Sequence, residues 1–248
     1  MVEHHIAAPM PVANPGRLQA VIFDVDGVIV DSPHERAWRE ALAGFADPSR
    51  FTTTFYQEHV AGKPRLDGAR AALEQLGVAD AARQAQLYAD RKQKMIEELI
   101  RAHAFTAYPD AVRMITAARA AGLRLAVASS SKNANDMLRL IPDQSGRKLI
   151  DVFDANVCGR ELRHGKPDPE IFLLAAAELR IAPEACVVVE DAPAGIQAAK
   201  AGAMIGLGIA RHQDRSLLEA AGADLVVTSL DRVDVDALGR GTLRSRPA

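Results

Sequence analysis

Two aspartates at the end of an apolar run are the residues of this chain best suited to chemistry. Asp24 and Asp26 come directly after Val21-Ile22-Phe23 and directly before Gly27. In a β-strand, residues two apart point to the same side, and a glycine allows the backbone to turn sharply afterwards. Because two neighbouring carboxylates repel each other unless a cation lies between them, the pair predicts a hard divalent metal ion. A lone Asp-x-Asp is also typical of solvated residues at a strand end.

A second acidic pair stands in the same context further along the chain. Glu190 and Asp191 follow the apolar run Val187-Val188-Val189. Ligands of open α/β sheets bind at the carboxyl ends of the strands, so a parallel sheet can bring both pairs to one edge. Two acidic strand ends favour a metal site over coincidence.

Hydroxyl and basic groups supply a possible phosphate site. The run Ser129-Ser130-Ser131-Lys132-Asn133 follows a third apolar segment, where hydroxyl groups and a helix N-terminus can hold phosphate oxygens. A simple helix cap is the alternative interpretation, since serine is common there. Lys166 lies between Gly165 and Pro167, in a loop stiffened by prolines; taken alone, it would be an ordinary surface lysine.

The elements that must position these residues read as an α/β fold. Five short apolar runs predict buried strands at 20–23, 123–128, 186–189, 204–209 and 225–227. Helical patterns at 111–121, 170–179 and 194–201 alternate with the later strands, and Gly202 is a typical helix end. This alternation predicts a doubly wound, Rossmann-like parallel sheet with helices on both faces.

A helical insertion is predicted between the first two strands. Residues 33–104 are too long for a simple crossover and show helical spacing of apolar residues. We interpret these positions as the core of a small helical cap domain, without a role in chemistry; they are Trp38, Ala41, Leu42, Phe45, Leu87, Met95, Ile96 and Leu99.

Composition sets the remaining boundaries. The α/β core is predicted at 17–32 and 105–230, with a disordered leader at 1–16 and a disordered tail at 231–248. A net charge of −2 gives no reason to expect a nucleic acid or an anionic membrane as partner, and no apolar run suggests a membrane anchor. We therefore expect a cytoplasmic protein, monomeric or weakly dimeric, with a small ligand. Cys158 and Cys186 do not form a metal-binding pair.

These motifs together resemble the haloacid dehalogenase superfamily. In order, they are Asp24-Val25-Asp26-Gly27-Val28, Ser129, Lys166-Pro167-Asp168-Pro169 and Glu190-Asp191, and the similarity covers roughly residues 20–230. The longer runs 129–133 and 190–196 look most like the β-phosphoglucomutase group, whose members carry an all-helical cap between the first two motifs.

The resemblance implies a mechanism of phosphoryl transfer. Asp24 would attack phosphorus, and Asp26 would serve as acid and base. Ser129 would orient the phosphoryl group, and Lys166 would neutralise its charge. The implied cofactor is Mg²⁺. Its implied ligands are Asp24, Asp26 through its backbone carbonyl, and Asp191, with Glu190 close by.

The resemblance also implies substrate-binding positions. In the core these are Gly27, Ser130, Ser131, Lys132 and Asn133. In the cap they are His34, Arg65 and Lys92, of which Arg65 suits a second phosphate because a guanidinium binds phosphate through two nitrogens. Ordinary exposed charges are the alternative interpretation for His34 and Lys92. The loop around Arg65 departs from the mutase pattern.

Three functions remain open on these residues. A Mg²⁺-dependent phosphatase acting on a small organic phosphate, such as a sugar phosphate, is favoured because most helical-cap members of the superfamily are phosphatases. The alternative is a β-phosphoglucomutase, which shares every core residue. A catalytically silent phosphate-binding protein is a minor third hypothesis, because Asp24, Asp26 and Lys166 are all present.

Overall fold

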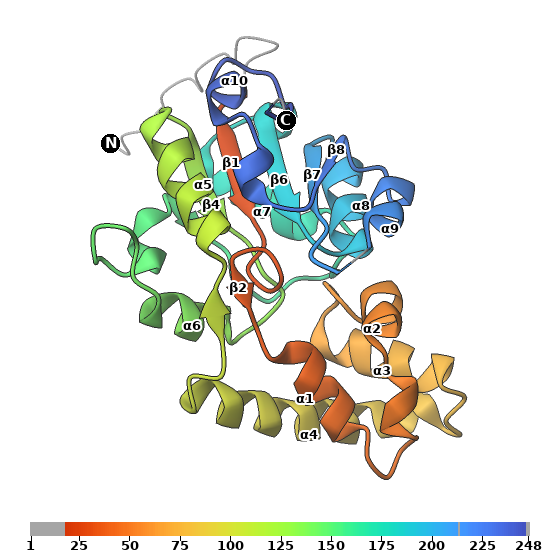
Figure 1. Cartoon of the computed structure of the whole chain (residues 1–248). Coiled ribbons are helices and arrows are strands. Elements are labelled where there is room, and N and C mark those ends of the chain that lie inside the picture. Colours follow the sequence, from red (N-terminus) through yellow and green to blue (C-terminus); the bar gives the residue numbers. More distant parts are fainter. Residues whose placement is uncertain (1–17, 213, 247–248) are drawn as a thin grey trace, which may run out of the picture.

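The core is a six-stranded parallel sheet, seen in a computed structural model that describes residues 18–212 and 214–246. The strand order is β5-β4-β1-β6-β7-β8 (Figure 1). The strands are β1 (Ala20–Phe23), β4 (Arg124–Val127), β5 (Ala155–Asn156), β6 (Cys186–Glu190), β7 (Ile205–Ile209) and β8 (Leu225–Val227). Strand β1 is central and pairs in parallel with β4 on one side and β6 on the other. The predicted doubly wound α/β fold is confirmed, although the two-residue strand β5 was too short to be predicted.

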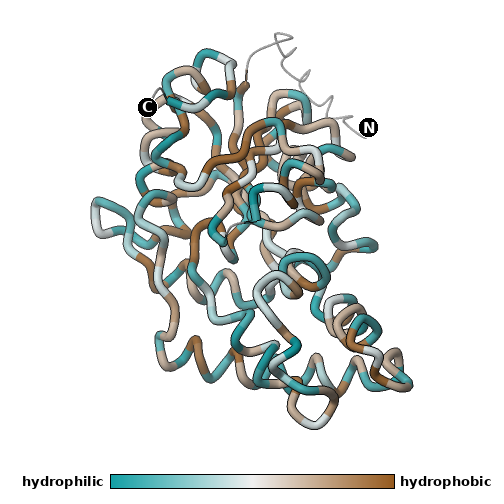
Figure 2. The backbone as a smooth tube through the Cα atoms, turned by 45° about the vertical axis from the view of Figure 1, so that its right-hand side comes forward, coloured by the Kyte–Doolittle hydropathy of each residue, from teal (hydrophilic) through white to brown (hydrophobic). Residues whose placement is uncertain are grey.

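Helices cover both faces of this sheet because its strands are apolar on both sides. Val21 and Phe23 of β1 pack with α5 (Pro109–Ala120) and α6 (Ala134–Leu140), whereas Ala20 and Ile22 pack with α7 (Glu170–Leu179) and α8 (Pro193–Ala201). Helix α9 (Arg215–Ala220) joins α8 at the β8 edge. Figure 2 shows the hydrophobic strands running through the centre of the core. Short 3-10 helices lie at Pro48–Arg50, Leu149–Val152, Pro183–Ala185 and Leu230–Arg232.

The segment predicted as a cap forms four helices beside the carboxyl ends of the strands (Figure 1). These are α1 (His34–Ala41), α2 (Thr53–His59), α3 (Arg65–Gln75) and α4 (Ala81–Arg101). Their common core centres on Trp38 and Tyr88, whose rings lie 5.1 Å apart. Helix α4 contributes to two cores, because Tyr88 belongs to the cap cluster and Ile96 and Ile100 belong to the core cluster.

Three positions of the predicted apolar stripe do not lie in the core of the cap. Leu87 is 60% exposed, because the buried face of α4 runs through Ala85, Tyr88 and Ala89 and position 87 points away from it. Ile96 is buried and Leu99 is partly buried, but both pack against the α/β core rather than inside the cap.

A short antiparallel ribbon links the cap to the core. Strand β2 (Val30–Asp31) leads out of the core and β3 (Thr106–Ala107) leads back, with Val30 paired to Ala107 and Asp31 to Thr106. Tyr108 N–H then donates to the carbonyl of Ile29 at 2.9 Å. The cap is therefore attached through two adjacent segments.

The predicted disordered tail is wrong for most of its length. Helix α10 (Val235–Gly239) packs against α5, and Val233 and Leu238 are buried in the core cluster. Asp234 caps this helix by accepting a hydrogen bond from Ala237 N–H at 2.9 Å. The apolar residues here are too few to show a period, so packing rather than pattern orders the segment. The predicted leader at 1–16 lies outside the described residues. No helix in the described part of the chain is both long and apolar enough to cross a bilayer.

Candidate active site

The first acidic residue lies beside a buried lysine. Asp24 follows β1 and is 5% exposed, and its Oδ1 accepts a hydrogen bond from Lys166 Nζ at 2.6 Å. The side chain of Lys166 is completely buried and also pairs with Glu190. The pKa of Asp24 is raised to about 7, chiefly by burial; Lys166 opposes this rise, and the charges of Glu190 and Asp26 add to it. The nucleophile candidate and the cation candidate of the sequence are thus in direct contact.

The second acidic pair completes a cluster of three buried carboxylates. Oxygens of Asp24, Glu190 and Asp191 lie within 4.8 Å of one another. Burial raises the pKa of Asp191 well above its ordinary value, and the charges of Glu190 and Asp24 raise it further. Lys166 alone does not balance this cluster. Its hard oxygen donors and excess negative charge fit a divalent cation such as Mg²⁺.

The members of this cluster are not equivalent. Glu190 already uses both oxygens, because Oε1 pairs with Lys166 and Oε2 accepts from the N–H groups of Asp191 and Ala192 at 2.7 and 2.9 Å. Asp24 and Asp191 are therefore the better placed to hold a cation, with Glu190 orienting Lys166. Among the described residues, the cluster does not include the side chain of Asp26.

Two glycines are required by the close packing around these acids. A Cβ on Gly27 would lie 1.9 Å from Asp191 Oδ2, and one on Gly195 would lie 1.8 Å from Glu190 Oε1. Gly27 also has a φ of +81°, a conformation that other residues rarely adopt. Gly27 thus shapes the site through its backbone and does not line the cavity described below.

The side chain of Asp26 points toward the cap. Its Oδ2 accepts from Ser129 Oγ at 3.3 Å, and its Oδ1 lies 3.3 Å from His34 Nε2 without the alignment of a hydrogen bond. Lys92 Nζ lies 2.6 Å from His34 Nδ1. When Lys92 is an ammonium group, which can only donate, His34 would carry its proton on Nε2, the nitrogen nearest Asp26.

Burial controls the charge of the two cap residues. It lowers the pKa of His34 to about 4, so this imidazole is neutral at pH 7 although Asp26 favours its charged form. Burial likewise lowers the pKa of Lys92 to about 7. The cap therefore presents a neutral donor and an adjustable cation to the acid/base candidate.

Serine hydroxyl groups accept hydrogen bonds within the loop after β4. Ser129 is buried, and its Oγ accepts from the N–H of Ser131 at 3.0 Å. Ser131 Oγ accepts from the N–H of Asn133 at 3.2 Å, and Asn133 Oδ1 accepts from Gln93 of the cap at 3.0 Å. The Ser129 loop therefore contacts both the acids and the cap.

A cavity of about 560 Å³ lies between the cap and the core. Most of the predicted site residues line it: Asp24, Asp26, His34, Arg65, Lys92, Ser129, Ser130, Ser131, Lys132, Asn133 and Asp191. Gly27, Lys166 and Glu190 lie outside its lining. The cap rests directly on the core here, since a Cβ on Gly165 would lie 1.9 Å from Pro64 Cγ and Ser130 Oγ donates to the carbonyl of Gly62 at 3.2 Å.

Several lining residues were not predicted. They are Trp38, Tyr56, Lys63, Gln86, Gln93, Arg160 and Arg163, among others. No spacing signal marks them, because they come from separate helices and loops of the cap and the core. Tyr56 is the most notable; burial and the nearby Asp191 raise the pKa of its phenol well above its ordinary value.

The chain is similar to known enzymes in sequence and in fold. The model of the haloacid dehalogenase-like hydrolases matches residues 18–202. A β-phosphoglucomutase of Mycobacterium bovis is 32% identical over 87% of this chain and 91% of its own length. A phosphorylated carbohydrates phosphatase of Thermotoga maritima is 28% identical over 84% of this chain and 94% of its own length. The crystal structure of an archaeal β-phosphoglucomutase from Pyrococcus sp. strain ST04 is 31% identical and superposes with a TM-score of 0.71, covering 89% of this chain and 97% of that one. The chain belongs to the haloacid dehalogenase-like hydrolase family and is an enzyme of its β-phosphoglucomutase-like subgroup.

Proposed function

We propose that this enzyme is a Mg²⁺-dependent phosphatase that hydrolyses a small phosphorylated sugar through an aspartyl-phosphate on Asp24. The observation that carries this proposal is the placement of Asp24. Asp24 lines the cavity between cap and core, its carboxylate contacts a fully buried lysine, and two further buried acids lie beside it. This combination can hold a phosphoryl group and attack it.

The reaction would consist of two successive displacements at phosphorus, in which these residues have different roles. In the first, an Asp24 oxygen forms a bond to phosphorus, the bond to the leaving oxygen breaks, and Asp26 gives its proton to that oxygen. In the second, Asp26 takes a proton from water as the water oxygen attacks phosphorus, and the Asp24 carboxylate is released. Lys166 reduces the repulsion between carboxylate and phosphate throughout, and the hydroxyl of Ser129 lies where it can orient the phosphoryl oxygens.

The acid cluster supplies the site for Mg²⁺. Asp24 and Asp191 would hold the ion, which when bound neutralises negative charge on the phosphoryl group. The three buried carboxylates carry more negative charge than one lysine can neutralise. Lys166 pairs with Asp24 and Glu190, whereas burial and the neighbouring negative charges raise the pKa of Asp191. We therefore expect activity to depend on added Mg²⁺ and to be lost with a chelator.

The cap supports a phosphorylated sugar as substrate. Arg65, Lys63 and Lys92 line the cavity from the cap, and Lys132 lines it from the core. These cations can bind a second phosphate or the phosphate end of a larger substrate. Two relatives at 28% identity bear the names phosphorylated carbohydrates phosphatase and hexitol phosphatase A.

A mutase reaction is the second candidate, and one contact favours it. Lys92 contacts His34, and His34 lies beside Asp26, the residue that would deprotonate either water or a sugar hydroxyl. Relatives from Mycobacterium bovis and Bacillus subtilis, each 32% identical, are named β-phosphoglucomutase. A catalytically silent phosphate-binding protein has no such support. It would be expected to lack Asp24, Asp26 or Lys166, and all three lie together in the candidate site. Cytoplasmic location and a monomeric or weakly dimeric state stay predictions.

One assay separates the two reactions. Purified enzyme with Mg²⁺ is given a panel of sugar phosphates, and release of inorganic phosphate is compared with conversion of β-glucose 1-phosphate, primed with its 1,6-bisphosphate, to glucose 6-phosphate. We expect phosphate release, abolished in Asp24→Asn. Isomerisation with little release would replace the phosphatase by the mutase, and neither reaction with any substrate would overturn both.

A further inference from the structure

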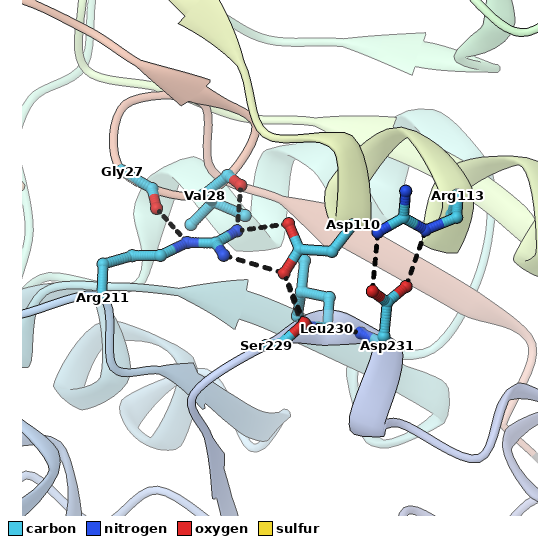
Figure 3. Close-up of polar contacts among 8 residues, drawn as sticks. All are labelled: Gly27, Val28, Asp110, Arg113, Arg211, Ser229, Leu230 and Asp231. Atoms are coloured by element: carbon cyan, nitrogen blue, oxygen red, sulfur yellow. Dashed lines mark hydrogen bonds and ion pairs between the residues drawn. The ribbon is translucent and has the colours of Figure 1, made fainter.

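A buried arginine–aspartate pair lies outside the cavity, where the β2–β3 ribbon enters the core. Arg211 follows β7, Asp110 lies in the first turn of α5, and their side chains are 9% and 8% exposed. Nη1 and Nη2 of Arg211 donate to Oδ2 and Oδ1 of Asp110 at 2.8 and 3.0 Å (Figure 3). Neither residue is among the described residues that line the cavity. Such two-point pairs are among the stronger polar contacts in proteins.

The same guanidinium also holds the turn that follows the catalytic aspartates. Nε of Arg211 donates to the carbonyl of Gly27 at 3.3 Å, and Nη2 donates to the carbonyl of Val28 at 3.1 Å (Figure 3). Inside the turn, the N–H of Ile29 donates to the carbonyl of Val25 at 2.9 Å. Arg211 thus fixes the outer edge of a turn whose inner edge is closed by its own backbone.

The position of this turn determines the position of two acids. Asp26 directly precedes Gly27, so the position of the turn determines the position of the Asp26 backbone, from which its carboxylate extends. On its other side, the backbone of Gly27 packs against the carboxylate of Asp191 so tightly that a Cβ would lie 1.9 Å from Oδ2. A shift of about 1 Å in reacting groups can lower a rate by about 10²-fold. A displaced turn would therefore disturb proton transfer and the acid cluster together.

Asp110 is itself anchored, which makes the arginine rigid. Its Oδ2 also accepts from Ser229 Oγ at 2.9 Å and from the N–H of Leu230 at 2.8 Å (Figure 3). The guanidinium of Arg211 lies over the ring of Tyr108, 3.8 Å from its centroid. Four segments far apart in sequence, at residues 27–28, 108–110, 211 and 229–230, therefore meet at this charge pair.

We propose that Arg211, held by Asp110, is a positioning residue for phosphoryl transfer that fixes the turn after Asp26 and thereby the placement of Asp26 and Asp191. This inference rests on the proposed function. Because Arg211 does not line the cavity, its loss should lower kcat and leave KM for a small aryl phosphate unchanged. A purely structural role would lower activity only in proportion to the folded fraction.

The test compares this buried pair with an exposed pair formed by the same helix, α5. Arg211→Met removes the arginine, and the double variant Arg211→Met with Asp110→Asn also removes the buried charge left behind. Arg113 is the matched control, since it forms a two-point pair with Asp231 at 2.8 and 2.6 Å, but both side chains are about half exposed. We expect kcat to fall by about 10- to 100-fold in both Arg211 variants, as for residues that orient a metal site, and to stay at the wild-type value in Arg113→Met.

Amide hydrogen exchange supplies a readout that does not need turnover. The N–H groups of Ile29 and Val30 should exchange faster in both Arg211 variants and not in Arg113→Met. Unchanged exchange, or a kcat loss equal to the loss of folded protein or equal in the Arg113 variant, would overturn the proposal. Faster exchange together with a wild-type enzyme that transfers no phosphate would instead overturn the proposed function and support the structural part of this inference.

Discussion

Replacing Lys166 by methionine tests how far its positive charge stabilises the buried carboxylates of Asp24 and Glu190. The lysine side chain is fully buried, its Nζ lies 2.6 Å from Asp24 Oδ1, and it also pairs with Glu190. Methionine has a similar length and can still pack on Phe172, whose ring lies 4.9 Å from Nζ. The change therefore removes one charge from between two buried carboxylates and leaves the packing largely intact.

The expected magnitude follows from burial. Removing one partner of a buried ion pair costs about 3–5 kcal/mol, because the remaining charge stays out of water. In a protein of this size each kcal/mol lowers Tm by about 2–4 °C, so Tm should fall by about 6–20 °C. Loss of a preorganised group that stabilises transferring charge should lower kcat by about 10²- to 10³-fold.

The assay is thermal unfolding followed by circular dichroism in a chelator, with kinetics measured separately in Mg²⁺. Lys200→Met is the matched control, because Lys200 pairs with Asp224 at 2.7 Å while the two side chains are 38% and 39% exposed. A surface pair of this kind contributes about 0–1 kcal/mol. Equal Tm shifts in the two variants, or near-normal turnover in Lys166→Met, would refute the reasoning.

The remaining predictions concern the nucleophile, specificity, cap closure and pH. Asp24→Asn should abolish turnover with an unchanged circular dichroism spectrum, because the amide keeps the shape and loses the nucleophilic charge; activity near wild type would exclude the aspartyl-phosphate. Arg65→Ala should lower kcat/KM much more for substrates with a second phosphate than for aryl phosphates, and equal losses would make Arg65 structural. Gly165→Ala should lower kcat/KM at normal core stability, because the new Cβ would lie 1.9 Å from Pro64 Cγ and hold the cap away; wild-type kinetics would contradict this contact. Burial raises the pKa of Asp110, but hydrogen bonds from Arg211 and from backbone and hydroxyl donors hold it below 3.8. A depressed folded-state pKa adds stability above the unfolded value and loses it as pH falls, so below about pH 4 the unfolding free energy should fall less steeply in Asp110→Asn than in wild type, as urea titrations can show.

The core site was predictable because each part of it is local. Asp24 and Asp191 each follow an apolar strand, and strand order alone brings those strand ends together. Gly27 was also predictable. A glycine directly after Asp26 indicated a sharp turn, and in the structure Gly27 has a positive φ. Short-range patterns therefore sufficed to place the acidic residues of the candidate site.

The contacts between cap and core could not be predicted in the same way. Lys92 lies 2.6 Å from His34, and Gln93 lies 3.0 Å from Asn133, only because the cap adopts one orientation on the core. No periodicity in either segment encodes that orientation. Leu87 illustrates the same limit within a helix, since a stripe of apolar residues does not say which of them faces a neighbour.

Helix α4 packs into the hydrophobic cores of both the cap and the α/β domain, and this affects how products can leave. Tyr88 is buried in the cap, whereas Ile96 and Ile100 are buried with the core, so one rigid helix joins two hydrophobic interiors. An opening motion that parted these isoleucines from the core would return both to water, at about 1.5–3 kcal/mol each. An open form that costs about 3–6 kcal/mol would be populated less than about 1% of the time. Exchange of substrate and product would then depend on this sparsely populated open form.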